Sequence, residues 1–84
     1  MEFKNWLDVF LNEKNINIKD EFYKVEKNNV VHFIEGEVLL QLIKNTNEIE
    51  KQEIKHKLIK IDFYNGNVND YFAFLAECYV KNNY

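Results

Sequence analysis

The sequence predicts a small, mainly α (α+β) domain in which a two-stranded β-hairpin packs on a bundle of helices, in the order α-β-β-α-α-α. Apolar residues recur with the spacing of amphipathic helices along most of the chain. Two short segments rich in β-branched and aromatic residues flank an Asn-Asn pair, which indicates a hairpin. The 84 residues suffice for one hydrophobic core and are too few for two, so residues 1–84 are expected to form a single domain.

The first helix is predicted over Glu2–Lys14, because apolar residues gather on one of its faces. These residues are Phe3, Trp6, Leu7, Phe10 and Leu11. The segment Asn15–Ile16–Asn17 then breaks the helix. Ile16 and Ile18 alternate with polar residues, which predicts a short extended link.

A hairpin follows, with strands predicted over Glu21–Lys27 and Val30–Ile34 and a turn at Asn28–Asn29. Asparagine tolerates the positive φ that a two-residue hairpin turn requires. This turn pairs Lys27 with Val30, Val25 with His32, and Tyr23 with Ile34. One face then carries Tyr23, Val25, Val30 and Ile34 around His32, and the other carries Phe22, Val31 and Phe33 beside Lys24 and Glu26. A two-stranded ribbon is marginal alone, so we expect it to lie on the helices.

Two helices are predicted after the hairpin. Gly36 precedes the first, which spans Glu37–Lys44 with an inward face of Val38, Leu39, Leu42 and Ile43. Asn47 and Glu50 have the spacing of an N-cap and its acidic third residue, so the second helix begins there and runs through Lys60. Its apolar residues form two nearly opposite stripes, Ile54/Leu58/Ile61 and Ile49/Ile59/Phe63. Either this helix is covered on both sides, or it ends early and residues 61–64 follow another path.

The last segment, residues 65–84, predicts a helix that is apolar around most of its circumference. Gly66 is expected at positive φ before it, and Asn67 is expected to be its N-cap. Only a narrow strip of Asp70, Glu77 and Lys81 is polar. The domain core satisfies one apolar face, and Tyr71, Phe74 and Cys78 lie on its flank. We therefore predict that these three residues contact another protein chain, in the simplest case a two-fold homodimer.

No catalytic, cofactor or metal site is predicted, and the chain is not expected to be an enzyme. Neither His32 nor His56 has a second ligand or an orienting partner at a suitable spacing. Cys78 lies far from the start of its helix on an apolar face, so it is interpreted as a buried, inert thiol. Serine is absent and Thr46 lies in a connecting segment, which leaves no hydroxyl nucleophile.

Charge and composition limit the class of partner. Eleven basic and fourteen acidic residues give a net charge of −3, the wrong sign for a general nucleic-acid binder. The alternative function, a nucleic-acid-associated accessory protein, depends on the helix Lys51–Lys60, whose lysines do not form one stripe. The single cysteine excludes an internal disulfide. No apolar run approaches the roughly 18 residues needed to span a bilayer, and no leader opens the chain, so we expect a cytoplasmic protein.

The segment from Lys57 to Val68, continuing to Phe72 and Leu75–Ala76, resembles a pattern in small uncharacterised proteins of bacterial phages and mobile elements. The similarity extends to the region of Trp6–Leu7 and to that of His32. It implies one compact domain and an accessory role, and it assigns no activity, cofactor or catalytic residue. The leading hypothesis is therefore a non-catalytic interaction or regulatory protein that binds another protein. Its predicted core consists of Phe3, Trp6, Leu7, Phe10, Val38, Leu42, Ile54, Leu58, Phe72 and Leu75.

Overall fold

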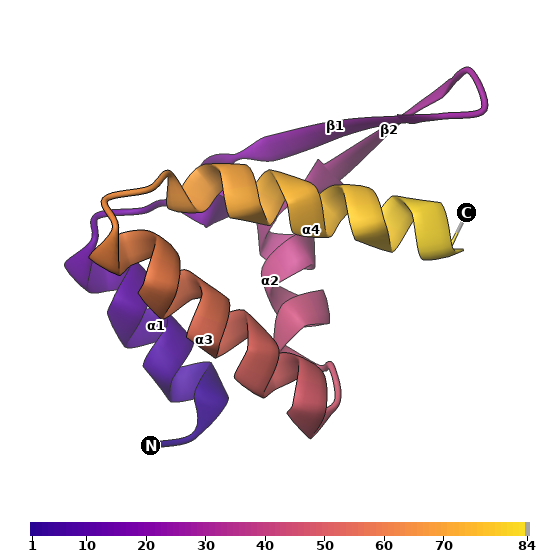
Figure 1. The fold of residues 1–84 in the computed structure, drawn as a ribbon. Helices are drawn as coiled ribbons and strands as arrows, with labels where there is room; N and C mark the ends of the chain where they lie inside the picture. The colour runs from indigo at the N-terminus through magenta and orange to yellow at the C-terminus, as the bar shows by residue number, and fades with distance from the viewer. Residues whose placement is uncertain (84) are drawn as a thin grey trace.

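The computed structural model describes residues 1–83 and has the predicted order of helices and strands (Figure 1). The elements are α1 (Phe3–Glu13), the 3-10 helix η1 (Ile18–Asp20), β1 (Phe22–Lys27), β2 (Val30–Glu35), α2 (Gly36–Lys44), α3 (Glu48–Phe63) and α4 (Val68–Asn83). A mainly helical domain with one antiparallel hairpin is thereby confirmed. The predicted extended link is wrong at Ile18–Asp20, where the chain makes a turn of 3-10 helix and buries Ile18.

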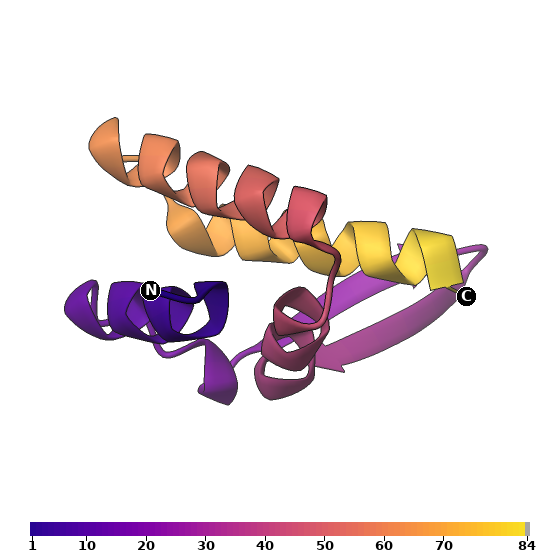
Figure 2. The same ribbon diagram turned by 90° about the horizontal axis from the view of Figure 1, so that it is seen from below.

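In Figure 2, α3 and α4 form one layer, and α1, α2 and the hairpin form the other. α3 packs on both α1 and α4, and β1 packs on α4, so α4 lies between the hairpin and α3 (Figures 1 and 2). α2 follows β2 directly and packs on η1. Two ion pairs join helices distant in sequence: Lys44 Nζ lies 2.6 Å from Asp8 Oδ1, and Lys14 Nζ lies 3.0 Å from Asp62 Oδ2.

The hairpin has the predicted register, with Tyr23 opposite Ile34 and Val25 opposite His32. Asn28 and Asn29 have φ angles of 54° and 63°, as a type I′ turn requires. Its inner face buries Tyr23, Val25 and Ile34, and Val30, also assigned to this face, remains exposed beside the turn.

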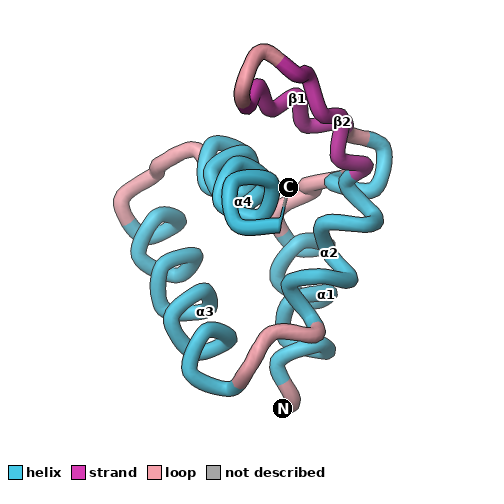
Figure 3. Tube along the Cα trace, turned by 90° about the vertical axis from the view of Figure 1, so that its right-hand side faces the viewer, coloured by secondary structure: helices cyan, strands magenta, loops and turns pink. Residues whose placement is uncertain are grey.

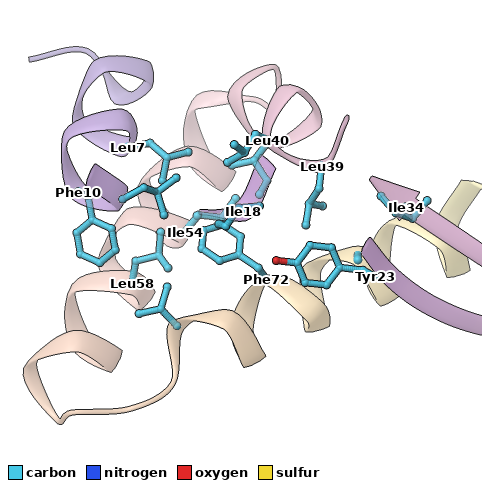
Figure 4. Packing of buried hydrophobic residues seen from close by; sticks show 14 of the residues in the cluster. Leu7, Phe10, Ile18, Tyr23, Ile34, Leu39, Leu40, Ile54, Leu58 and Phe72 are labelled. Carbon is cyan, nitrogen blue, oxygen red and sulfur yellow. The ribbon is translucent and has the colours of Figure 1, made fainter. Parts of the chain in front are cut away.

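One hydrophobic cluster holds the elements together (Figure 4). Six residues of the predicted core are buried: Phe3, Leu7, Phe10, Ile54, Leu58 and Phe72. Trp6, Leu42 and Leu75 are half-buried. The prediction is wrong for Val38, which is 46% exposed.

The close contact between Gly36 and Ile18 explains the error at Val38. A Cβ atom on Gly36 would lie only 1.6 Å from the carbonyl oxygen of Ile18, so the bare backbone of Gly36 faces the core. The residues one and two turns further along that face are Leu39, Leu40 and Ile43, and all three are buried. Val38 consequently points outward.

α3 begins at the predicted N-cap, where Asn47 Oδ1 accepts a hydrogen bond from the Glu50 N–H at 2.8 Å. Neither of the two alternatives for this helix holds, because it continues to Phe63 without ending early and yet is not covered on both sides. Ile54 and Leu58 are buried, whereas Ile49 and Phe63 on the opposite stripe are exposed. Within residues 1–83, only one of the two stripes is covered.

The junction between α3 and α4 differs from the prediction in one respect. Asn65, not Gly66, has the positive φ of 56°. Asn65 N–H donates to the Asp62 carbonyl at 3.0 Å, and Gly66 N–H donates to the Ile61 carbonyl at 2.7 Å, which together make a Schellman motif. The motif places its left-handed residue one position earlier than expected, and asparagine tolerates that conformation. Asn67 is the N-cap of α4 as predicted, because its Oδ1 accepts from Asn69 N–H at 2.9 Å.

Candidate protein-binding groove

A groove of about 530 Å³ lies between α2, α3 and the C-terminal part of α4. Figure 3 shows how these three helices are arranged, with α4 seen end-on. Its apolar surface comes from all three helices, with Leu39 and Leu42 on α2, Ile54 on α3 and Leu75 on α4. Among residues 1–83, the lining is Leu39, Leu42, Ile43, Thr46, Glu50, Glu53, Ile54, Tyr71, Phe74, Leu75, Cys78, Tyr79, Asn82 and Asn83. The groove is therefore a largely apolar surface assembled from segments distant in sequence.

The three residues predicted to form an interface, Tyr71, Phe74 and Cys78, all line this groove. Their spacing along α4 places them on one side of the helix over two turns. The rings of Tyr71 and Phe74 are stacked, with centroids 6.2 Å apart and an interplanar angle of 21°. Phe74 is 55% exposed, and Tyr71 is half-buried. Cys78 is also half-buried and so is less enclosed than its interpretation as a buried thiol implied.

The charge of the groove has one sign. Within the part of the chain that the structure describes, Glu50 and Glu53 of α3 are the only charged residues in the lining, and both are exposed. Burial raises the pKa of the Tyr71 phenol, and the neighbouring Cys78 and Glu53 raise it further. Tyr71 is therefore a neutral phenol at physiological pH and can donate a hydrogen bond. An apolar surface beside two carboxylates favours an apolar ligand that carries positive charge.

The lysines of α3 lie in two places, with Lys51 apart from the other three. Lys51 lies 3.4 Å from Glu48 Oε1, and Lys55 Nζ lies 5.3 Å from the centroid of the Trp6 ring. Lys55, Lys57 and Lys60 line an open hollow of about 660 Å³ along the same helix, together with His56 and Glu53. Lys51 and Lys55 thus have partners within the domain, and the hollow that holds the other lysines also contains the carboxylate of Glu53.

The histidines and the remaining acidic residues make no metal site in the part of the chain that the structure describes. His32 is half-buried on the hairpin, and His56 is exposed on α3. Across residues 1–83, no three side chains of His, Cys, Asp or Glu come close enough together to hold a metal ion. Over the same residues, no helix has the length and apolarity needed to cross a bilayer.

The sequence pattern indicates the α4 side of the groove but not the sides that α2 and α3 form. Glu50, Glu53 and Leu39 were not assigned to any site, since their position beside α4 depends on how the helices pack. Leu42 was assigned to the core but is half-buried at the groove. The spacing of Gly36, Leu39, Leu40 and Ile43 was the available signal for the orientation of α2.

Comparisons with protein-family models, curated proteins and solved structures found no match. The groove must therefore be interpreted from its own chemistry.

Proposed function

We propose that this protein is a non-catalytic interaction protein that binds a basic, amphipathic helical segment of another protein in the groove between α2, α3 and α4. The observation that carries the proposal is the stacked Tyr71–Phe74 pair, which lies partly exposed in a groove that also holds the carboxylates of Glu50 and Glu53. Such a segment would place its apolar side chains against the groove and its Lys or Arg residues beside the two carboxylates. An accessory role of this kind for the protein is also what its resemblance to small proteins of phages and mobile elements implies.

The composition of the groove fits this kind of ligand. Amphipathic helices bind in apolar grooves through side chains spaced three or four residues apart. Partly exposed aromatic residues at the centre of such a surface contribute most of the binding energy in many interfaces. The acidic residues at the edge attract a basic partner and disfavour an acidic one.

The nucleic-acid alternative has weaker support. Lys51 and Lys55 have partners within the domain, and the net charge of −3 opposes binding to phosphate. Retention on DNA or RNA that falls as salt rises, and that is lost when Lys57 and Lys60 are changed to Gln, would favour this alternative over the groove.

Two synthetic helical peptides test the proposal directly. They share one apolar face of Leu residues and carry either Lys or Glu on the other face. Because Cys78 is the only cysteine and lines the groove, its rate of modification by a thiol reagent reports whether the groove is occupied. We expect the Lys peptide to slow this modification several-fold and the Glu peptide to have little effect. Equal effects of the two peptides, or none from either, would contradict the proposal.

Two variants of this protein provide the matched comparison. Phe74→Asp should abolish protection of Cys78 by the Lys peptide, because it removes the exposed ring and puts a polar group where the Leu face of the peptide would pack. Phe63→Asp makes the same change at an exposed phenylalanine of α3 outside the groove and should leave protection intact. If Phe74→Asp instead abolishes self-association in sedimentation experiments, a second copy of the chain occupies the groove.

A further inference from the structure

The outer face of the hairpin carries an exposed apolar patch that the groove does not use. Phe22 and Phe33 are each 66% exposed, and Val31 is 42% exposed. All three side chains project from the face opposite to buried Tyr23, Val25 and Ile34. The hairpin lies along α4, and its turn projects past the C-terminal end of that helix (Figure 1).

The free edge of β2 adds a backbone component to this patch. Gly36 N–H donates to the Glu21 carbonyl at 2.8 Å, and hydrogen-bonded pairs alternate along an antiparallel ladder. The hydrogen-bonded pairs within the hairpin are therefore Tyr23–Ile34, Val25–His32 and Lys27–Val30. It follows that Val31, Phe33 and Glu35 direct their N–H and C=O groups away from β1. In residues 1–83, no backbone group of another element bonds to these three.

The two edges of the hairpin differ in their protection. β1 carries Lys24, Glu26 and Lys27, lies against α4, and is tied to it by a hydrogen bond of 2.9 Å from Lys27 Nζ to the Lys81 carbonyl. β2 has the sequence VVHFIE, with no lysine, no proline and one charge at its end. Exposed edge strands are normally blocked by lysine, proline or a bulge. β2 has none of these devices.

We infer that β2 is a self-association edge, which pairs antiparallel with β2 of a second copy to make a four-stranded sheet across a two-fold axis. A register centred on Phe33 joins the outward backbone groups of Val31 to those of Glu35 in the second copy, and those of Phe33 to its equivalent. This register keeps each side chain on its own face of the sheet. It places no like charges opposite each other, because His32 faces Ile34 and Val31 faces Glu35.

The occupant of the edge is a second copy because the strand is complementary to itself. Phe33 meets Phe33 on the outer face, so each copy covers part of the other's exposed ring. The same register leaves Phe22 one strand away from the axis, and it leaves the groove between α2, α3 and α4 open. This inference is therefore independent of the proposed function.

A matched pair of variants tests the edge by sedimentation over micromolar to millimolar concentrations. Phe33→Lys brings two positive charges together at the axis and should weaken dimerisation at least tenfold. Phe22→Lys makes the same change at an equally exposed residue of the same face and should leave dimerisation unchanged. A wild-type protein that stays monomeric throughout, or equal effects of the two variants, would overturn the inference.

Hydrogen exchange of the wild-type protein locates the contact independently of any variant. As concentration rises, the amides of Val31, Phe33 and Glu35 should become protected, whereas those of Lys24 and Glu26 on the opposite edge should stay fast. Dimerisation without this protection would overturn the inference and place the contact elsewhere. Loss of peptide binding in Phe74→Asp would leave both results unchanged, which separates this test from that of the groove.

Discussion

At the scale of single residues, Tyr23 places a polar group in the apolar core. Its hydroxyl is the one buried side-chain polar atom in residues 1–83 without a hydrogen-bond partner, and it points toward Phe72 and Leu39 (Figure 4). A buried polar group that lacks a partner costs free energy of folding. We predict that Tyr23→Phe stabilises the protein by about 1 kcal/mol. Thermal or denaturant unfolding at neutral pH checks this, and a loss of stability would show that the hydroxyl is satisfied in solution.

The same residue gives a pH dependence with a defined sign. Burial, followed by the nearby Glu21, raises the pKa of Tyr23 above its ordinary value of 10.0. Above that pH the unfolded chain loses the proton while the folded chain retains it, so the free energy of unfolding falls as pH rises. Tyr23→Phe should therefore reduce the alkaline loss of stability. The pKa of Tyr71 is also raised, so Tyr71 should contribute to the alkaline loss of stability that remains in Tyr23→Phe.

At the scale of elements, the two glycines have different structural roles, neither of which requires positive φ. A Cβ at Gly36 would meet the backbone oxygen of Ile18 at 1.6 Å, so α2 and η1 would have to move apart. A Cβ at Gly66 would meet Ile61 Cγ2 at 2.9 Å and the Ile61 carbonyl oxygen at 3.2 Å, so a much smaller shift would relieve the contact. We predict that Gly36→Ala costs at least about 3 kcal/mol and Gly66→Ala about 1 kcal/mol. Equal melting temperatures of the two variants would contradict this packing of α2.

How much of each element could be predicted depended on whether its signal was local. The Asn28–Asn29 turn determines the hairpin register from two residues, and Asn47 marks the start of α3 through its own side chain. The orientation of α2 was not predictable in this way, because it depends on contact with Ile18, well before it in the chain. η1 was missed because three residues are too few to show a helical period.

At the scale of the whole molecule, a single core connects the helices and the hairpin. Phe72 of α4 is fully buried within it, beside residues of α1, α3 and the hairpin (Figure 4). Phe72→Ala should cost about 3–5 kcal/mol, comparable to the lower end of total stability for a small domain. We therefore expect this variant to be largely unfolded at room temperature by circular dichroism. A folded variant with an unchanged melting transition would contradict the central position of α4.

The candidate groove was predictable only in part at this scale. The excess of apolar residues on α4 indicated that Tyr71 and Phe74 have more apolar surface than one small core can cover. The acidic edge was not predictable, because Glu50 and Glu53 come beside α4 only through the packing of α3. The sequence thus indicated a surface on α4, and the packing of the helices determines its charge.

Asn65, in the Schellman motif after α3, also affects the chemical stability of the protein. In an Asn-Gly dipeptide, the glycine nitrogen readily attacks the asparagine side chain, which forms a succinimide and releases ammonia; asparagine is accordingly a thermolabile residue. Here the Gly66 nitrogen is held by its hydrogen bond to the Ile61 carbonyl at 2.7 Å, which restrains it from that attack. Deamidation at Asn65 should then proceed only when the end of α3 opens. The rate of deamidation in stored protein would therefore report how often this junction opens.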